Sequence, residues 1–165
     1  MARRSTDPIK AAARKSKAQR RVGVGASCTH TQCAESRPDA LVPRSRPRLC
    51  EECYRRLRGK KATDAHHIAG KSNSPVTIEV RANDHRAALS PAQYEWPTAT
   101  LENRDGSPLL RAAGALRGVC DIIAELFVSL MLGCAAMLEA LDAILRQRWG
   151  PTWWTGTSLD GWQPQ

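Results

Sequence analysis

Apolar residues recur through residues 109–148 at alternating spacings of four and three, and the segment contains no proline. This heptad pattern predicts one long helix with an apolar stripe, about 60 Å in length if it is unbroken. Ser107 and Pro108 indicate its start, and Gly150 and Pro151 indicate its end. The stripe, called the seam below, consists of Leu109, Ala113, Leu116, Cys120, Ile123, Phe127, Leu130, Cys134, Met137, Leu141 and Ile144.

Other apolar residues flank the seam, so the middle of the predicted helix is apolar nearly all round. A helix of this kind packs among other helices or lies in lipid. Its longest uncharged run, between Glu125 and Glu139, has thirteen residues, fewer than the about twenty that a bilayer span requires. We therefore expect residues 109–148 to form a homo-oligomer or to pack against the rest of the chain.

Two alternatives for this segment stay open. Membrane attachment is the first, because tryptophan favours bilayer interfaces and several tryptophans follow the helix. They are Trp149, Trp153, Trp154 and Trp162, which otherwise predict aromatic packing at the helix end. A helical hairpin is the second alternative, with a break at Gly118 or Gly133.

A period of two replaces the helical period in residues 64–90, which read DAHHIAGKSNSPVTIEVRANDHRAALS. The pieces HHIAG and PVTIEVR predict two strands, the second with Val76, Ile78 and Val80 on one face. DHRAALSPAQ then predicts a helix that Pro91 interrupts or restarts. Strand, strand and helix, followed by the long helix, predict an α+β fold.

Composition divides the chain into five segments. Residues 1–22 are a basic arm with too few aliphatic side chains to bury a face, so we expect it to be disordered or transiently helical. Residues 23–96 hold the cysteine pairs and the strands, and residues 97–107 form a linker. Residues 108–150 are the apolar helix, and residues 151–165 are a Trp-rich tail.

Positive charge is concentrated in the N-terminal third. Through Lys61 there are seventeen Lys and Arg against five Asp and Glu, a net of +12, whereas the remainder has eight against eleven, a net of −3. This asymmetry favours a polyanionic partner such as a phosphate backbone or an acidic membrane. No apolar segment of a secretory signal follows the N-terminal charges, so we expect a cytoplasmic protein whose cysteines bind metal rather than form disulfides.

Four cysteines form two hooks with the spacing of a structural zinc site. Cys28 and Cys33 are separated by four residues, Cys50 and Cys53 by two, and sixteen residues lie between the pairs. Four thiolates at such spacing close a tetrahedron around Zn²⁺. His30 is an alternative ligand within the first hook. Cys120 and Cys134 lie on the seam and are predicted to be buried thiols.

The two hooks followed by DAHHIAGKSNSP and NDHRAALS resemble the HNH endonuclease family, and more closely the small HNH-like zinc proteins of bacteria and phages. The resemblance covers residues 28 to about 96. It implies a treble-clef-like ββα-metal domain supported by zinc, in which His66 and His85 bind a catalytic divalent cation (Mg, Mn, Ni or Zn). His67 would be the general base that activates water for phosphodiester hydrolysis.

The asparagine that orients the base in the family has no direct counterpart here. Its expected place falls near Val76 or Thr77, so Asn73 and Asn83 are the substitutes predicted to orient His67.

DNA is the expected partner, gripped through its phosphate backbone by arginines of the cysteine-containing segment. These are Arg44, Arg46, Arg48, Arg55, Arg56 and Arg58. The alternative is a catalytically inactive zinc module that binds nucleic acid or protein and oligomerises through its helix.

Overall fold

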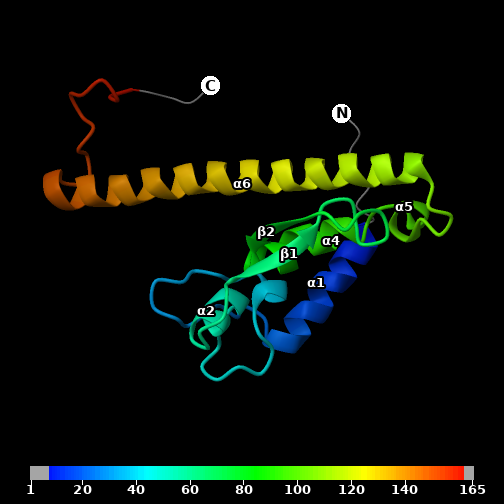
Figure 1. Ribbon diagram of the computed structural model, residues 1–165. Helices are drawn as coiled ribbons and strands as arrows, with labels where there is room; N and C mark the ends of the chain where they lie inside the picture. The colour runs from blue at the N-terminus through cyan, green and yellow to red at the C-terminus, as the bar shows by residue number, and fades with distance from the viewer. Residues whose placement is uncertain (1–7, 162–165) are drawn as a thin grey trace. The chain divides into compact units, whose positions relative to one another are not determined.

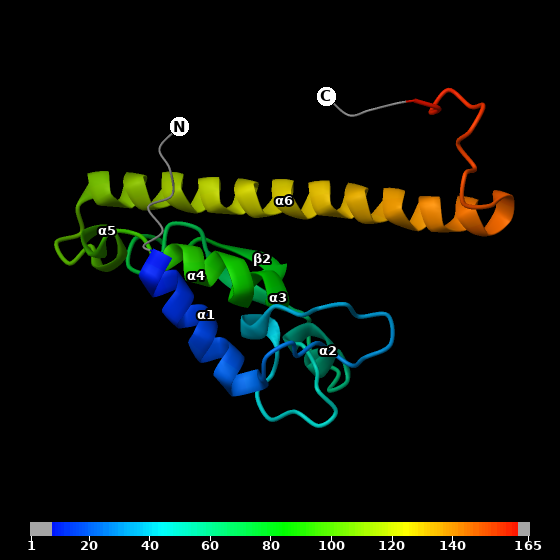
Figure 2. The ribbon, with the colours of Figure 1, turned by 180° about the vertical axis from the view of Figure 1, so that it is seen from behind.

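A computed structural model describes residues 8–161, and residues 1–7 and 162–165, including Trp162, lie outside the description. The chain forms two compact units that meet between Glu125 and Leu126. The α+β class, a two-stranded sheet and the long C-terminal helix are confirmed. Figures 1 and 2 show these elements from opposite sides.

The basic segment is helical where it is described, because α1 spans Pro8–Val22. The sequence predicted a disordered or transiently helical arm, and the structure has a helix over these residues. Ala18 and Val22 are 4% and 5% exposed, so the helix does bury one side. Arg14 also forms an ion pair with Glu95 and donates a hydrogen bond to the Pro91 carbonyl. Two small apolar residues one turn apart, together with one partly buried ion pair, are enough to dock a helix that carries charge elsewhere.

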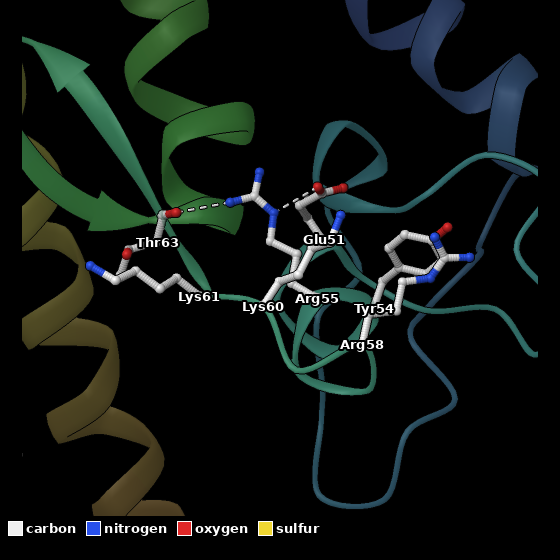
Figure 3. Close-up of a pocket in the computed structure, with 7 residues that line it drawn as sticks. All are labelled: Glu51, Tyr54, Arg55, Arg58, Lys60, Lys61 and Thr63. Atoms are coloured by element: carbon white, nitrogen blue, oxygen red, sulfur yellow. Dashed lines mark hydrogen bonds and ion pairs between the residues drawn. The ribbon is translucent and has the colours of Figure 1, made fainter.

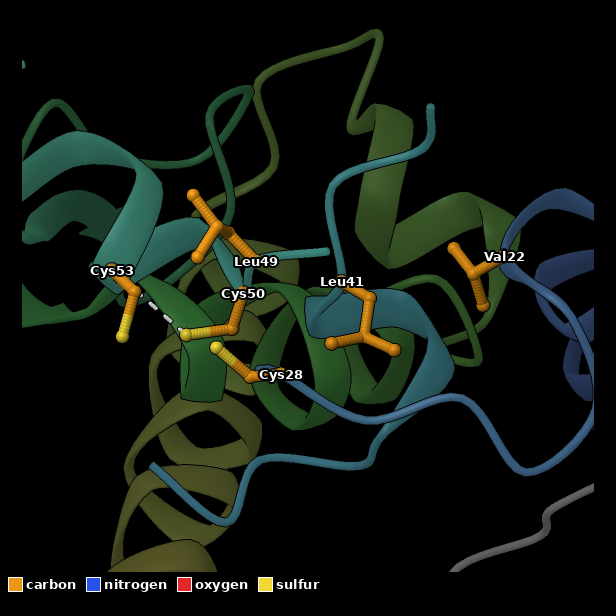
Figure 4. Packing of buried hydrophobic residues seen from close by; sticks show 6 residues of the cluster. All are labelled: Val22, Cys28, Leu41, Leu49, Cys50 and Cys53. Atoms are coloured by element: carbon orange, nitrogen blue, oxygen red, sulfur yellow. Dashed lines mark hydrogen bonds between the residues drawn. The ribbon is translucent and has the colours of Figure 1, made fainter. Parts of the chain in front are cut away.

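A small core surrounds the cysteine hooks. It contains the short helices η1 (Pro38–Ala40) and α2 (Glu51–Arg56). Val22, Leu41 and Leu49 pack here with the cysteines, as Figure 4 shows. Three aliphatic side chains make a thin core, in keeping with a domain that depends on a bound metal.

The sheet is an antiparallel hairpin of β1 (Thr63–His67) and β2 (Thr77–Arg81), in which His66 pairs with Ile78 and His67 with Thr77. Ile78 and Val80 are half-buried on one face, whereas Val76 precedes the strand and is 58% exposed.

A continuous helical segment follows β2, made of α3 (Ala82–Asp84), η2 (His85–Leu89) and α4 (Ser90–Gln93). The η2 turn is wider than an α-turn, since the Ser90 amide bonds to the carbonyl of His85, five residues earlier. Pro91 has no amide hydrogen and its ring conflicts with the carbonyl four residues back, so a widened turn lets the helix pass through it.

The predicted linker is partly ordered, because α5 spans Thr98–Glu102. It leads to α6, which spans Pro108–Trp149 without a break. The helical hairpin is therefore not formed, and Gly118 and Gly133 lie inside the helix. A glycine costs only about 1 kcal/mol in a helix interior, which good helix formers on either side outweigh.

The second unit begins at Leu126 and contains the C-terminal part of α6 and the tail. The Trp153 indole donates to Asp142 Oδ1 (2.8 Å), and Arg146 lies over the Trp154 ring. The aromatic packing predicted at the helix end is thus formed by these two tryptophans. By length and composition alone α6 could cross a membrane, a criterion that helices of soluble proteins also meet.

Candidate functional site

The four predicted cysteine ligands come together. Their Sγ atoms all lie within 4.8 Å of one another, and those of Cys33 and Cys50 are 3.8 Å apart. Cys50 caps α2, with its sulfur accepting from the Cys53 amide, so the second hook is shaped by the start of that helix. A tetrahedron with metal–sulfur bonds of about 2.3 Å has sulfurs about 3.8 Å apart. The cluster could therefore hold a metal ion such as zinc.

The cluster also has the electrostatics of a metal site. Burial raises the pKa of Cys53, and the neighbouring Cys50 and Cys33 thiols raise it further. Thiolates would form together here only if a cation compensated their charge. His30, the alternative ligand, is exposed and its Nδ1 lies 2.8 Å from the Thr31 carbonyl oxygen.

His66 and His85, the two histidines predicted to bind a divalent cation, face each other. Their ring centroids are 5.2 Å apart at an interplanar angle of 71°. His66 is 2% exposed. Burial lowers its pKa, and the charges that His85 and His67 carry when protonated lower it further. A neutral imidazole keeps the lone pair that metal binding requires.

His85 is held from both sides. Its Nδ1 lies 3.0 Å from Asp64 Oδ2, and its Nε2 lies 3.1 Å from the Ser90 hydroxyl. Burial alone would raise the pKa of Asp64, but hydrogen bonds from Arg55 and His85 hold it below its usual range. An ionised carboxylate only accepts hydrogen bonds, so Nδ1 carries the proton, and Nε2 of the neutral ring accepts from the Ser90 hydroxyl.

Arg55 fixes the carboxylate in this chain of contacts. It contacts Asp64 Oδ1 (2.7 Å), Glu51 Oε1 (2.9 Å) and the Thr63 carbonyl (2.8 Å). A carboxylate that orients a histidine is a frequent support of metal sites. The sequence reasoning missed this role of Asp64, although its position two residues before His66 on a strand places both side chains on one face.

His67 points away from that face, as the alternation of strand side chains predicts. It is half-buried, and its Nδ1 lies 3.2 Å from the Ser74 carbonyl oxygen. A carbonyl only accepts hydrogen bonds, so Nδ1 donates and Nε2 carries a lone pair. This is the tautomer that a general base needs.

Neither predicted asparagine forms a hydrogen bond with His67 within residues 8–161. Asn73 donates to the Ala69 carbonyl (2.9 Å) and the Thr100 carbonyl (2.7 Å), which closes the loop between β1 and β2. Because Ser74 follows it directly, Asn73 holds the carbonyl that contacts His67. Orientation of the base by a backbone oxygen cannot be read from side-chain types.

Asn83 has a different task. Its Oδ1 accepts from the Glu52 amide (3.2 Å), which ties the start of α3 to α2. It therefore connects the cysteine cluster to the helix that carries His85.

A pocket of about 410 Å³ opens beside His85. Asp64 and Ser90 line it together with Arg21 of α1 and Arg86 of η2. Arg86 is paired with Glu51 (3.1 Å). The lining therefore carries two arginines and two aspartates, since Asp39 lies there as well, and Arg21 and Arg86 are the groups that could contact an anionic ligand.

A second pocket, of about 390 Å³, lies on the cysteine domain and is lined by four cations, as Figure 3 shows. Arg58 stacks over the Tyr54 ring, with its guanidinium carbon 4.3 Å from the centroid. Lys60 is exposed, while Arg55 contacts Glu51 and Asp64. The pocket combines an aromatic face with exposed cations, an arrangement found where proteins contact nucleic acids.

The six arginines predicted to grip DNA differ in how free they are. Arg44, Arg46 and Arg58 are exposed. Arg48 donates to the Val22 carbonyl, and Arg56 pairs with Glu52 (3.5 Å) while remaining 66% exposed. Arg55 pairs with Glu51 and Asp64. Three of the six arginines, Arg48, Arg55 and Arg56, therefore have partners within the protein.

Comparisons of the chain with protein-family models, with curated proteins and with solved structures found no match.

Proposed function

We propose that this chain is a DNA-binding, HNH-type metal-dependent endonuclease that hydrolyses phosphodiester bonds. The observation that carries the proposal is the placement of two histidine Nδ1 atoms, one on β1 and one on η2, within hydrogen-bonding distance of an oxygen acceptor. His67 keeps a lone pair on Nε2 because Ser74 accepts from Nδ1, and His85 keeps one because Asp64 accepts from Nδ1. One lone pair suits proton abstraction and the other suits a metal.

In this mechanism His67 would take a proton from the attacking water, which must come within its reach although His67 lies on the opposite face of β1 from His66. His66 and His85 would hold the divalent cation, with water and substrate phosphate as further ligands. A cation bound there would stabilise the charge that develops on the phosphate and its leaving oxygen. Arg21 and Arg86, which line the pocket beside His85, would draw the phosphate backbone toward it.

The cysteine cluster would bind zinc and keep the hairpin and η2 in place. Four sulfur donors leave no open coordination position, which is typical of structural rather than catalytic zinc. DNA would be held mainly through phosphate contacts of Arg44, Arg46 and Arg58, with Lys60 beside the Tyr54 ring.

Nicking of supercoiled plasmid by the full chain with Mg²⁺, Mn²⁺ or Ni²⁺ tests this function. His67→Ala is expected to lower the rate about 10²- to 10⁴-fold, the range for loss of a general base. His30→Ala is the matched control, because His30 is exposed and outside the site. Unchanged melting temperature and zinc content would show that the variants fold. If His67→Ala nicked the plasmid as fast as the unsubstituted protein, His67 would not be the general base.

One observation favours the second candidate, a catalytically inactive zinc module. The Ser90 hydroxyl lies 3.1 Å from His85 Nε2 and already satisfies the lone pair that a cation would use. Such a module would bind DNA with an affinity that falls steeply with salt, and it would not cleave DNA whichever divalent cation is added. Metal analysis and the nicking assay on one preparation separate the two candidates.

A further inference from the structure

Two faces of helix α6 differ in their surroundings, since one packs against the first unit and the other is exposed. In the first unit, Gly114, Gly118, Asp121 and Glu125 meet the rest of that unit. A Cβ at Gly118 would lie 1.7 Å from the Ile68 carbonyl oxygen, so only glycine allows this approach. Asp121 accepts from the Trp96 indole (2.9 Å), and Glu125 contacts Arg37 (3.5 Å).

These four residues follow the same heptad spacing as the seam but lie about half a turn away from it around the helix. With the seam residues at positions a and d of the heptad, the four occupy b and f, the outer positions of a coiled coil. Within the first unit, the rest of that unit therefore covers the back of the helix between Gly114 and Glu125 and leaves Leu116 and Ile123 of the seam exposed.

The seam and its flanking e and g positions are solvent-exposed. Twelve large apolar side chains on this face are between 44 and 81% exposed, including Leu109, Leu116, Ile123 and Leu130. Burial of each side chain would remove on the order of 60–120 Å² of apolar surface from water, so the twelve together could bury roughly 1,000 Å². A typical stable interface buries about 800 Å² on each partner.

Charge separates a protein partner from a lipid one. Eight residues of α6 are charged, and all except Arg117 and Arg148 lie at b or f positions. They comprise four arginines and four acidic residues, a net of zero. A helix that lies on an anionic bilayer instead carries an excess of Lys and Arg on its polar face.

We propose that the seam of α6 binds the seam of a second copy of this chain, as a helical pair or a small bundle. The heptad register, the covered back face and the available area all fit this occupant. The apolar e and g positions widen the interface beyond a narrow two-stranded seam. This assembly goes beyond the proposed nuclease function and does not depend on it.

Sedimentation velocity of the full chain over about 1–100 μM, without detergent, tests the assembly. We expect a species of at least twice the chain mass. Leu130→Glu places a charge on the seam and is expected to weaken association at least about 100-fold, because the carboxylate would be buried without a partner. The matched control is Leu132→Glu, also on α6 and 66% exposed, but at an f position. It should leave the assembly intact.

Circular dichroism and zinc content would verify that both variants fold. A monomer at every concentration would overturn the proposal. Equal loss of assembly in both variants would overturn it as well, since it would mean that no face is preferred. Flotation with lipid vesicles that either substitution abolishes would assign the helix to lipid instead.

Discussion

The cysteine cluster and the histidine cluster are built on opposite principles. The cysteine cluster holds four like donors, of which Cys50 and Cys53 are 0% and 4% exposed, among a few aliphatic side chains. The histidine cluster draws on β1, η2 and α4, and its rings have neutral or anionic hydrogen-bond partners in Asp64, Ser90 and Ser74.

The difference indicates what each cluster contributes. Packed thiols gain little from one another, and burial disfavours the thiolate form of Cys53, so we expect a bound cation to stabilise the cysteine cluster. The histidine cluster keeps its geometry through hydrogen bonds that exist without an ion. We therefore expect metal removal to unfold the cysteine cluster. Changes in the histidine cluster should instead alter divalent-cation binding or catalysis and leave the fold intact.

The largest effect should come from the cysteine cluster. Cys50→Ser, or chelation of the metal, is expected to unfold the core around the cysteine cluster, because apparent zinc-binding energies of about 10–16 kcal/mol act as folding energy in small zinc domains. Circular dichroism and metal analysis measure the loss. Cys134→Ser is the control, since Cys134 is exposed on α6. If Cys50→Ser had the same melting temperature as the unsubstituted protein, the cysteine cluster would not stabilise the fold and the two clusters would not differ in this respect.

A smaller effect is expected at the support of His85. Asp64→Asn removes the charge that holds the Nδ1 proton of His85 and should lower divalent-cation affinity or cleavage about 10- to 100-fold. Asp39→Asn is the matched control, because Asp39 lines the same pocket. Mn²⁺ titration gives a readout that does not require activity. If the zinc content fell with Asp64→Asn, the two clusters would not be independent.

The smallest effect concerns the protonation of His66. Its pKa is lowered first by burial and then by His85, so His85→Gln should raise the pKa of His66 while leaving it below 6.5. NMR titration of the ring protons measures this, with His30→Gln as the control. The folded protein binds this proton less tightly than the unfolded chain does. The contribution of His66 to the free energy of unfolding is therefore complete above pH 6.5, the pKa of the unfolded chain, and it declines as the pH falls below that value.

A His66 pKa that stays the same in His85→Gln would show that the two rings do not interact. It would leave the histidines as separate side chains rather than one cluster.

Local patterns predicted much of the fold. The hairpin, the helix after it and the bounds of α6 follow from periodicity and from Ser107, Pro108 and Gly150, all of which act over a few residues. The cysteine cluster was equally accessible, because two short hooks and one donor type specify it. The sequence left α1 between a disordered and a transiently helical segment, since its burial depends on Ala18, Val22 and a distant ion pair with Glu95.

The details of the histidine cluster were only partly accessible. The residue types of His66, His67 and His85 were readable, but the oxygen that fixes His67 belongs to the backbone of Ser74. Asn73 acts through that loop rather than through the base itself. Every residue has a backbone carbonyl, so the sequence does not show which carbonyl accepts a given hydrogen bond.

The sequence by itself therefore determined the elements, the cysteine hooks and the heptad register of α6, because each arises from spacing along one segment. Only the tertiary structure decided which face of α6 remains free, since Gly114 and Gly118 matter through the carbonyls of Ala69 and Ile68. It likewise decided the tautomers of His67 and His85, because each depends on an oxygen atom that folding brings within hydrogen-bonding distance.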